Sequence, residues 1–72
     1  MNYQQILNKA SNKLQLKNLR SPKLDSELIL AKTLNVRREE ILLNLNKKIN
    51  KSDLKKFNYY LNMRSNYKPI AH

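Results

Sequence analysis

Apolar residues recur at intervals of three and four along most of the chain, and this helical spacing constrains the fold more than any other feature. No segment alternates apolar and polar residues as a half-buried strand would. Four helices are expected, running from Asn2 to about Asn18, from Ser21 to Asn35, from about Arg38 to Leu45, and from Asn50 onward. The pattern therefore predicts an all-α fold: a compact bundle of four short helices with an extended C-terminal tail.

Local start signals support three of these helices. Asn2 and the glutamine three residues later form a capping box, and Asn50 with Asp53 repeats the pattern. Ser21 is a good N-cap, and Pro22 fits the first helical position because its fixed φ suits the helix and its missing N–H is not needed there. These signals place the beginnings of the first, second and fourth helices.

The expected core follows from the same spacing. The chain contains no glycine, so Asn18 is the plausible left-handed stop of the first helix, and Asn35 is expected to end the second. Leu16 and Leu19 are expected to fold back onto the core, and the second helix is expected to be central because several adjacent positions are apolar. The predicted inward residues are Tyr3, Ile6, Leu7, Ala10 and Leu14, then Leu24, Leu28, Ala31 and Leu34 with Ile29 and Leu30, then Ile41, Leu42 and Leu45, then Leu54, Phe57, Leu61 and Arg64.

The size of the chain limits its chemistry. Leu, Ile, Val and Phe supply 20 of the 72 residues, enough for one modest core. Such a core leaves no room for a deep substrate pocket of roughly 300 Å³ or more, which argues against a complete enzyme. Cysteine is absent and His72 is the sole histidine, so a metal site built on paired histidines or thiolates is excluded. We expect a cytoplasmic protein without a membrane span.

The formal net charge is +10, from 15 Lys and Arg against 5 Asp and Glu. Such a surplus attracts acidic partners and suggests nucleic acid as one of them. The charge is, however, spread along the chain, and the many lysines and asparagines beside no glycine are typical of biased codon use. A nucleic-acid partner is therefore the less favoured interpretation, although it stays open.

Two segments resemble one protein family. The stretch from Ser21 to Ala31, SPKLDSELILA, is similar to the helix-opening segment near the start of the HemK/PrmC family, which methylates the glutamine amide of peptide chain release factors. Arg64 followed by Pro69, Ile70 and an alanine resembles the family's second motif, and the helix lengths between the motifs match. Neither motif is specific alone, but the pair at this separation is considerably stronger.

The resemblance implies a two-part organisation. Residues 1–66 would form the helical substrate-recognition domain, and residues 67–72 would begin the linker to a catalytic domain that this chain lacks. In the implied parent enzyme, that second domain binds S-adenosylmethionine and holds the glutamine of the release factor's Gly-Gly-Gln loop with an asparagine-proline-proline-tyrosine motif. This motif is missing here, so the sequence predicts no catalytic, cofactor or metal residue in the fragment. Its expected partners are a release factor and its own catalytic domain.

The sequence departs from the family at the second motif. Tyr67 stands where the family usually has glycine, Lys68 where glutamate is frequent, and His72 where tyrosine is common. Asn18 and Asn35 also occupy positions where relatives often have glycine. The loss of glycine at position 67 puts in doubt how tightly the chain turns there.

Several basic residues are candidates for partner contact. Lys9, Lys13 and Lys17 form a stripe that could face an acidic release factor or RNA, although a solvated helix face is the simpler interpretation. Arg37 and Arg38 lie at the start of a helix, where positive charge is mildly unfavourable, so either a partner or the neighbouring Glu39 and Glu40 must compensate.

A second group of residues is expected at the linker. Asp25 either complements the dipole of the second helix or pairs with Arg64 or Lys68 and fixes the exit of the chain. The remaining linker candidates are Tyr67, Pro69, Ile70 and His72. Three tyrosines, at positions 59, 60 and 67, could stack nucleic-acid bases, but completing a core or an interface is more usual.

Three hypotheses follow for function. The leading one is a docking domain that positions the release factor for a distant active site. A free-standing nucleic-acid- or ribosome-binding module is the alternative, and it predicts a steep salt dependence of binding. A purely structural bundle is the third, in which Leu28→Ala would cost about 2–5 kcal/mol.

Overall fold

The computed structural model describes residues 1–17 and 20–66. Its helices are α1 (Tyr3–Leu16), α2 (Pro22–Leu34), α3 (Arg38–Leu43) and α4 (Lys51–Ser65). Within the described ranges the strand-like pairing amounts to one isolated antiparallel bridge, between Asn2 and Lys48. The predicted all-α bundle is confirmed. The predicted C-terminal tail, Asn18 and Leu19 lie outside the described residues.

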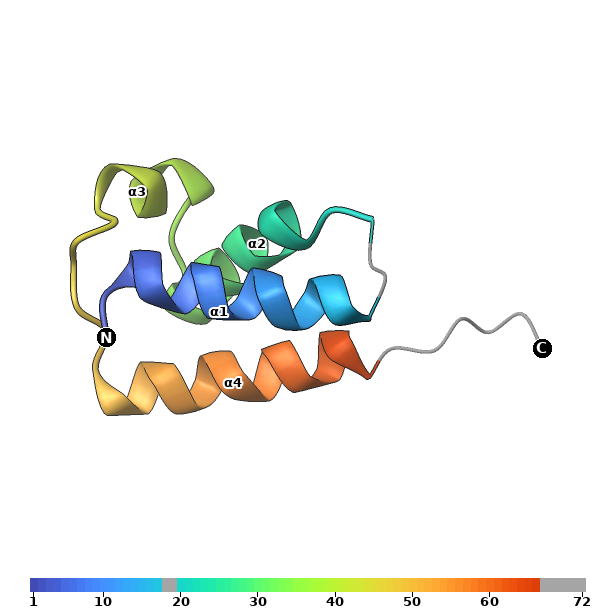
Figure 1. Ribbon diagram of the computed structural model, residues 1–72. Helices are drawn as coiled ribbons and strands as arrows, with labels where there is room; N and C mark the ends of the chain where they lie inside the picture. The colour runs from blue at the N-terminus through green and yellow to red at the C-terminus, as the bar shows by residue number, and fades with distance from the viewer. Residues whose placement is uncertain (18–19, 67–72) are drawn as a thin grey trace.

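Three of the helices form the body of the bundle. Figure 1 shows α1 and α4 side by side, both running away from the N-terminus, with α2 against them and α3 at one end. α2 contacts all three other helices, which confirms its predicted central position. None of the helices in the described part of the chain combines the length and the hydropathy of a membrane span.

The N-terminus of α1 is tied to the connection between α3 and α4. A helix leaves its first four N–H groups without partners inside the helix. Here the N–H groups of Tyr3 and Gln4 donate to the carbonyls of Lys47 and Leu45, at 2.9 and 3.0 Å. The capping box supplies the next bond, from the Gln5 N–H to the side chain of Asn2 at 2.9 Å, as predicted. This connection therefore completes the first turn of α1 and holds α3 near it.

One cluster of apolar residues forms the core. All five residues of the predicted α1 stripe are buried, and Phe57 and Leu61 of α4 meet them as expected. Phe57, Leu14, Leu30 and Ile41 are the largest apolar side chains that are almost completely enclosed. The helical spacing of the sequence therefore identifies the inner faces of α1 and α4 correctly.

The predicted core stripe of α2 is correct in its second half, where Leu30 and Ala31 are buried and Ile29 and Leu34 pack against the core, and wrong at two leucines. Leu24 and Leu28 are 41% and 49% exposed, whereas Ser26 and Thr33 are buried. The two hydroxyls can be buried because each donates to the carbonyl oxygen four residues earlier, Ser26 at 2.7 Å and Thr33 at 2.8 Å. Leu30 supplies the large core side chain of α2.

The helix ends require further corrections. Leu16 does not fold back onto the core but is 84% exposed. The Ser21 side chain makes no capping hydrogen bond, although Pro22 does occupy the first turn of α2. Asn35 ends α2 as predicted, and it does so in the left-handed conformation, with φ 56° and ψ 46°. α3 ends at Leu43, two residues before the predicted Leu45.

Candidate functional site

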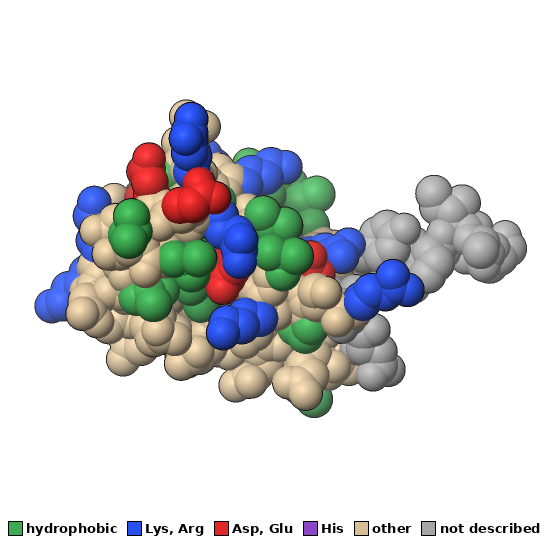
Figure 2. All heavy atoms as spheres, turned by 90° about the horizontal axis from the view of Figure 1, so that it is seen from above, with side chains coloured by type: hydrophobic (Ala, Val, Ile, Leu, Met, Phe, Trp, Pro, Cys, Tyr) green, Lys and Arg blue, Asp and Glu red, His purple; other side chains and the backbone are tan. Residues whose placement is uncertain are grey.

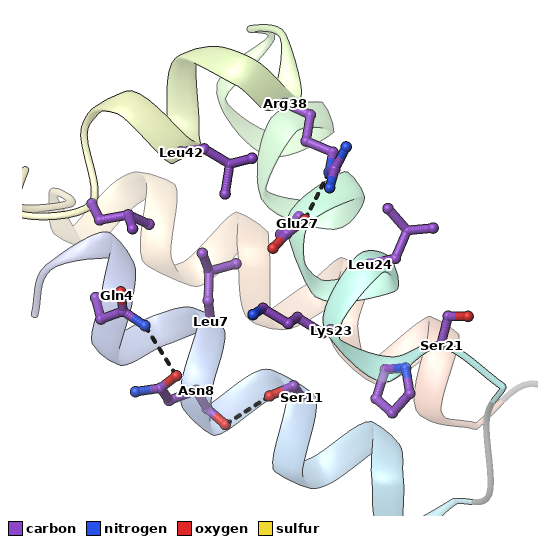
Figure 3. Close-up of a pocket in the computed structure, with 12 residues that line it drawn as sticks. Gln4, Leu7, Asn8, Ser11, Ser21, Lys23, Leu24, Glu27, Arg38 and Leu42 are labelled. Atoms are coloured by element: carbon purple, nitrogen blue, oxygen red, sulfur yellow. Dashed lines mark hydrogen bonds and ion pairs between the residues drawn. The ribbon is translucent and has the colours of Figure 1, made fainter.

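An open groove of about 690 Å³ lies between α1, the beginning of α2, and α3. We call it the leucine groove, because Leu7, Leu24, Leu42 and Leu45 supply its apolar surface. In Figure 3, Leu7 and Leu42 point toward one another from α1 and α3, and Lys23 reaches in from α2. α3 contacts α2 and buries Ile41 in the core, whereas Leu42 stays 39% exposed on the groove side.

An ion pair joins the walls of the leucine groove. The Arg38 Nε donates to Glu27 Oε1 at 2.7 Å, so α3 is held to α2 at this point (Figure 3). The Glu27 side chain is only 5% exposed, whereas that of Arg38 is 42% exposed. A buried carboxylate is costly without a partner, and Arg38 supplies that partner for Glu27. Arg38 therefore pairs with Glu27 rather than with the neighbouring Glu39 or Glu40. The ion pair with Glu27 explains why a positively charged residue stands at the start of α3.

Exposed leucines extend the groove into a wider apolar surface. Leu28 lies one helical turn beyond Leu24, and both are about half exposed. Figure 2 looks onto the face that carries α3 and shows hydrophobic side chains there among Lys, Arg and acidic side chains. Lys23 is exposed at the rim, while the acidic group that lines the groove, Glu27, is already paired. The surface therefore offers apolar contacts together with an unbalanced positive charge.

A second ion pair lies at the end of the bundle where α4 stops. The Arg64 Nη2 donates to Asp25 Oδ2 at 3.0 Å, and the Asp25 side chain is 20% exposed. The predicted pair of Asp25 with Arg64 is therefore present. Asp25 also lies in the first turn of α2, the position on which the other alternative depends. The contact joins the first turn of α2 to the last turn of α4. That Asp25 fixes the exit of the chain stays a prediction.

The lysine stripe of α1 borders α4. Lys13 Nζ donates to Asn62 Oδ1 at 2.6 Å, and Lys9 and Lys13 line a smaller hollow of about 210 Å³ with Asn58. Lys17 is exposed beyond them. The stripe and the leucine groove thus use different side chains and different neighbouring helices.

The remaining predicted site residues are placed as follows. Arg37 is exposed just before α3, beside Arg38. The linker candidates Tyr67, Lys68, Pro69, Ile70 and His72 lie outside the described residues. Across residues 1–17 and 20–66, no group of three or more His, Cys, Asp or Glu side chains is arranged to hold a metal ion. The roles of all these residues stay predictions.

Sequence reasoning missed the leucine groove itself. It placed Leu24, Leu28 and Leu42 in the core, and their exposure is the main feature of the site. One signal was available: Leu28, Ile29 and Leu30 are consecutive, and three successive residues of a helix spread over about 200°, so they cannot all face one neighbour.

Comparisons with known proteins identify the family of the chain. Residues 5–72 match the family described as the PrmC N-terminal domain. Over 68 residues, or 94% of its length, the chain is 32% identical to a bifunctional methyltransferase of Rickettsia felis and 31% identical to a bifunctional methyltransferase of Rickettsia typhi. It spans only 13% of the length of each of these relatives. No solved structure matches the chain significantly. The match covers nearly all of the bundle, and the chain therefore belongs to the PrmC N-terminal domain family of the HemK/PrmC proteins.

Proposed function

We propose that this domain docks a peptide chain release factor for an S-adenosylmethionine-dependent methyltransferase that modifies the glutamine of the factor's Gly-Gly-Gln loop. The domain holds the body of the release factor and leaves the chemistry to the catalytic domain of the parent enzyme, in the cytoplasm. Family membership and the names of the two rickettsial relatives support the methyltransferase part of this proposal. Residues 1–66 are the docking unit, and residues 67–72 begin the linker.

The observation that carries the proposal is the half-exposed apolar surface formed by the leucine groove and the adjoining Leu28. Leu24, Leu28 and Leu42 each leave between 39% and 49% of their surface exposed. Full burial of a leucine side chain is worth about 1.5–3 kcal/mol, so covering the exposed part of each residue contributes roughly 1 kcal/mol to a complex. The three residues together therefore supply roughly 3 kcal/mol, a part of what a complex with a release factor requires.

Docking accelerates methylation by positioning. A second contact, distant from the reacting glutamine, raises the effective concentration of the Gly-Gly-Gln loop at the active site. The net charge of +10 adds long-range attraction to an acidic partner and speeds encounter more than it strengthens the complex. The Asp25–Arg64 pair serves the same end, since it sets the direction of the chain toward the catalytic domain.

The test is a binding titration of this chain with a bacterial release factor. The variant Leu24→Lys/Leu28→Lys should raise Kd at least tenfold, because about 1.4 kcal/mol of lost contact corresponds to a factor of ten. Leu16→Lys is the matched control, since Leu16 is 84% exposed and lies outside the groove. Equal effects of the groove variant and the control on Kd would contradict docking through this surface.

A further inference from the structure

Lysines lie close together on the side of the molecule where α1 and α4 are adjacent. Figure 1 shows the two helices adjacent and running in the same direction. The Lys13–Asn62 hydrogen bond fixes how they face one another, and the hollow shared by Lys9, Lys13 and Asn58 lies one turn earlier on both helices. The lysine stripe of α1 is therefore placed directly against one stripe of α4.

Two lysines of α4 continue this surface. Lys51 and Lys55 precede Asn58 and Asn62 at spacings of four, three and four residues, so all four lie on one stripe of the helix. Both lysines are exposed. We call the resulting surface, formed by Lys9, Lys13 and Lys17 of α1 and Lys51 and Lys55 of α4, the lysine seam. At a rise of 1.5 Å per residue, its α4 side alone extends about 16 Å from Lys51 to Asn62.

Acidic residues are kept away from the lysine seam. The described part of α1 contains none, and the two acids of α2 are held in ion pairs with Arg64 and Arg38. Glu39 and Glu40 lie on α3, which does not border the seam. Asp53 is two residues from Lys51, a rotation of about 200° around α4, so it lies on the opposite side of that helix. The positive charge of the seam is consequently not neutralised within the domain.

We propose that the lysine seam binds single-stranded RNA, independently of the leucine groove. Lysine ammonium groups are compact point charges that suit the phosphate backbone without reading sequence. The asparagine amides between them add donors and acceptors for phosphates and sugars. Tyr59, one helical turn after Lys55, is 62% exposed, with its ring 5.6 Å from that of Tyr60. This ring is available to stack an unpaired base, which favours a single strand over a duplex.

The number of lysines sets the expected salt dependence. For single strands, log affinity falls with log salt at a slope of about −0.7 for each phosphate neutralised, so five lysines give about −3.5. Raising salt from about 50 to about 200 mM should then lower affinity roughly 100-fold. The interaction carries little sequence preference, since it rests on backbone charge and stacking.

The experiment measures fluorescence anisotropy of a labelled oligouridine of about 12 nucleotides, titrated with the whole chain. Lys9→Glu/Lys13→Glu should weaken binding at least tenfold and make the slope about 1.4 less negative, as expected for two lost contacts. Lys23→Glu/Arg37→Glu is the matched control, because it changes the net charge equally on the side of the leucine groove. It should change affinity less than threefold. Tyr59→Ala should lower affinity without changing the slope.

Other outcomes would overturn the proposal. Equal losses in the two charge-reversal variants would show attraction by net charge alone, without a seam. Binding to phosphatidylserine vesicles but not to the oligouridine would assign the seam to a lipid surface. If the Lys9→Glu/Lys13→Glu variant loses its helical circular dichroism signal, the variant Lys51→Gln/Lys55→Gln is measured in its place. This second variant must keep the helical signal and bind the oligouridine more weakly. Leu24→Lys/Leu28→Lys should still bind the oligouridine, so a failure of release-factor docking leaves this test intact.

Discussion

Two leucines of α2 that are two residues apart should differ sharply in their contribution to stability. Leu30 is completely buried, whereas Leu28 is 49% exposed. Replacing Leu30 by alanine removes buried methyl groups and leaves a cavity, which costs about 2–5 kcal/mol. Leu28→Ala loses only the buried half of its transfer free energy, opens no closed cavity and gains helix propensity, so its cost should be below about 1 kcal/mol.

These magnitudes are large relative to the whole fold. At about 0.05–0.15 kcal/mol per residue, a domain of this length has a free energy of unfolding of roughly 4–11 kcal/mol. Leu30→Ala therefore removes a large part of it and should lower the melting temperature by about 8 °C or more, because each kcal/mol shifts a small domain by about 4–8 °C. Leu28→Ala should lower it by no more than about 8 °C.

Urea unfolding followed by circular dichroism distinguishes the two variants. With the slope m unchanged, the shift in midpoint reports the change in stability directly. A loss of more than about 2 kcal/mol for Leu28→Ala, equal to that for Leu30→Ala, would contradict the half-exposed position of Leu28. It would mean that Leu28 is a core residue, as the spacing of the sequence predicts, and that the exposed apolar surface beside the leucine groove does not exist.

Three further predictions concern individual contacts, each measured by urea unfolding. Asn35→Ala should cost about 1–2 kcal/mol, since Asn35 is left-handed, whereas Asn35→Gly should cost nothing; equal effects would be inconsistent with that conformation. Arg38→Met should cost about 1–3 kcal/mol by leaving the Glu27 carboxylate buried, and Glu27→Leu in the same chain should restore most of the loss. If Glu27→Leu does not restore stability, the loss of the ion pair is not the cause of the destabilisation by Arg38→Met. Asn50→Ala should cost about 1 kcal/mol by removing the 2.7 Å bond from the Asp53 N–H, and an unchanged midpoint would argue against this cap.

The sequence predicts well those parts of the fold that depend on short-range interactions. The capping residues Asn2 and Asn50 act three residues away: the predicted capping box is found at Asn2, and of the predicted box at Asn50 the bond from the Asp53 N–H is found. The stripe of α1 is also correct, because a single continuous apolar face leaves only one way to bury it. Asn35 ends α2 for a similarly local reason, its tolerance of the left-handed conformation.

Which residues of α2 are buried depends on the neighbouring helices, and short-range sequence patterns do not determine it. Three consecutive apolar residues make several faces plausible, and the buried hydroxyls of Ser26 and Thr33 look polar to any sequence pattern. Only the bonds to their own helix make them compatible with a core. The bonds from Tyr3 and Gln4 to the α3–α4 connection were also invisible, since backbone groups carry no sequence signature.

The candidate sites likewise divide into features that local sequence patterns predict and features that depend on packing. The lysine stripe of α1 follows from spacing alone, and the structure adds the neighbouring stripe of α4. Asp25 and Arg64 were recognised as one possible pair, although they are 39 residues apart. The pair of Arg38 with Glu27 and the exposure of the groove leucines both depend on where α3 packs, which no local pattern determines.

The most direct test of the docking account maps the contact surface residue by residue. Amide chemical shifts of the isotope-labelled chain are followed while unlabelled release factor is added. The account predicts that the largest perturbations cluster around the leucine groove, at Leu24, Leu28 and Leu42, with the exposed Leu16 unaffected. Perturbations confined to the lysine seam, or none at concentrations where the full-length methyltransferase binds, would contradict it.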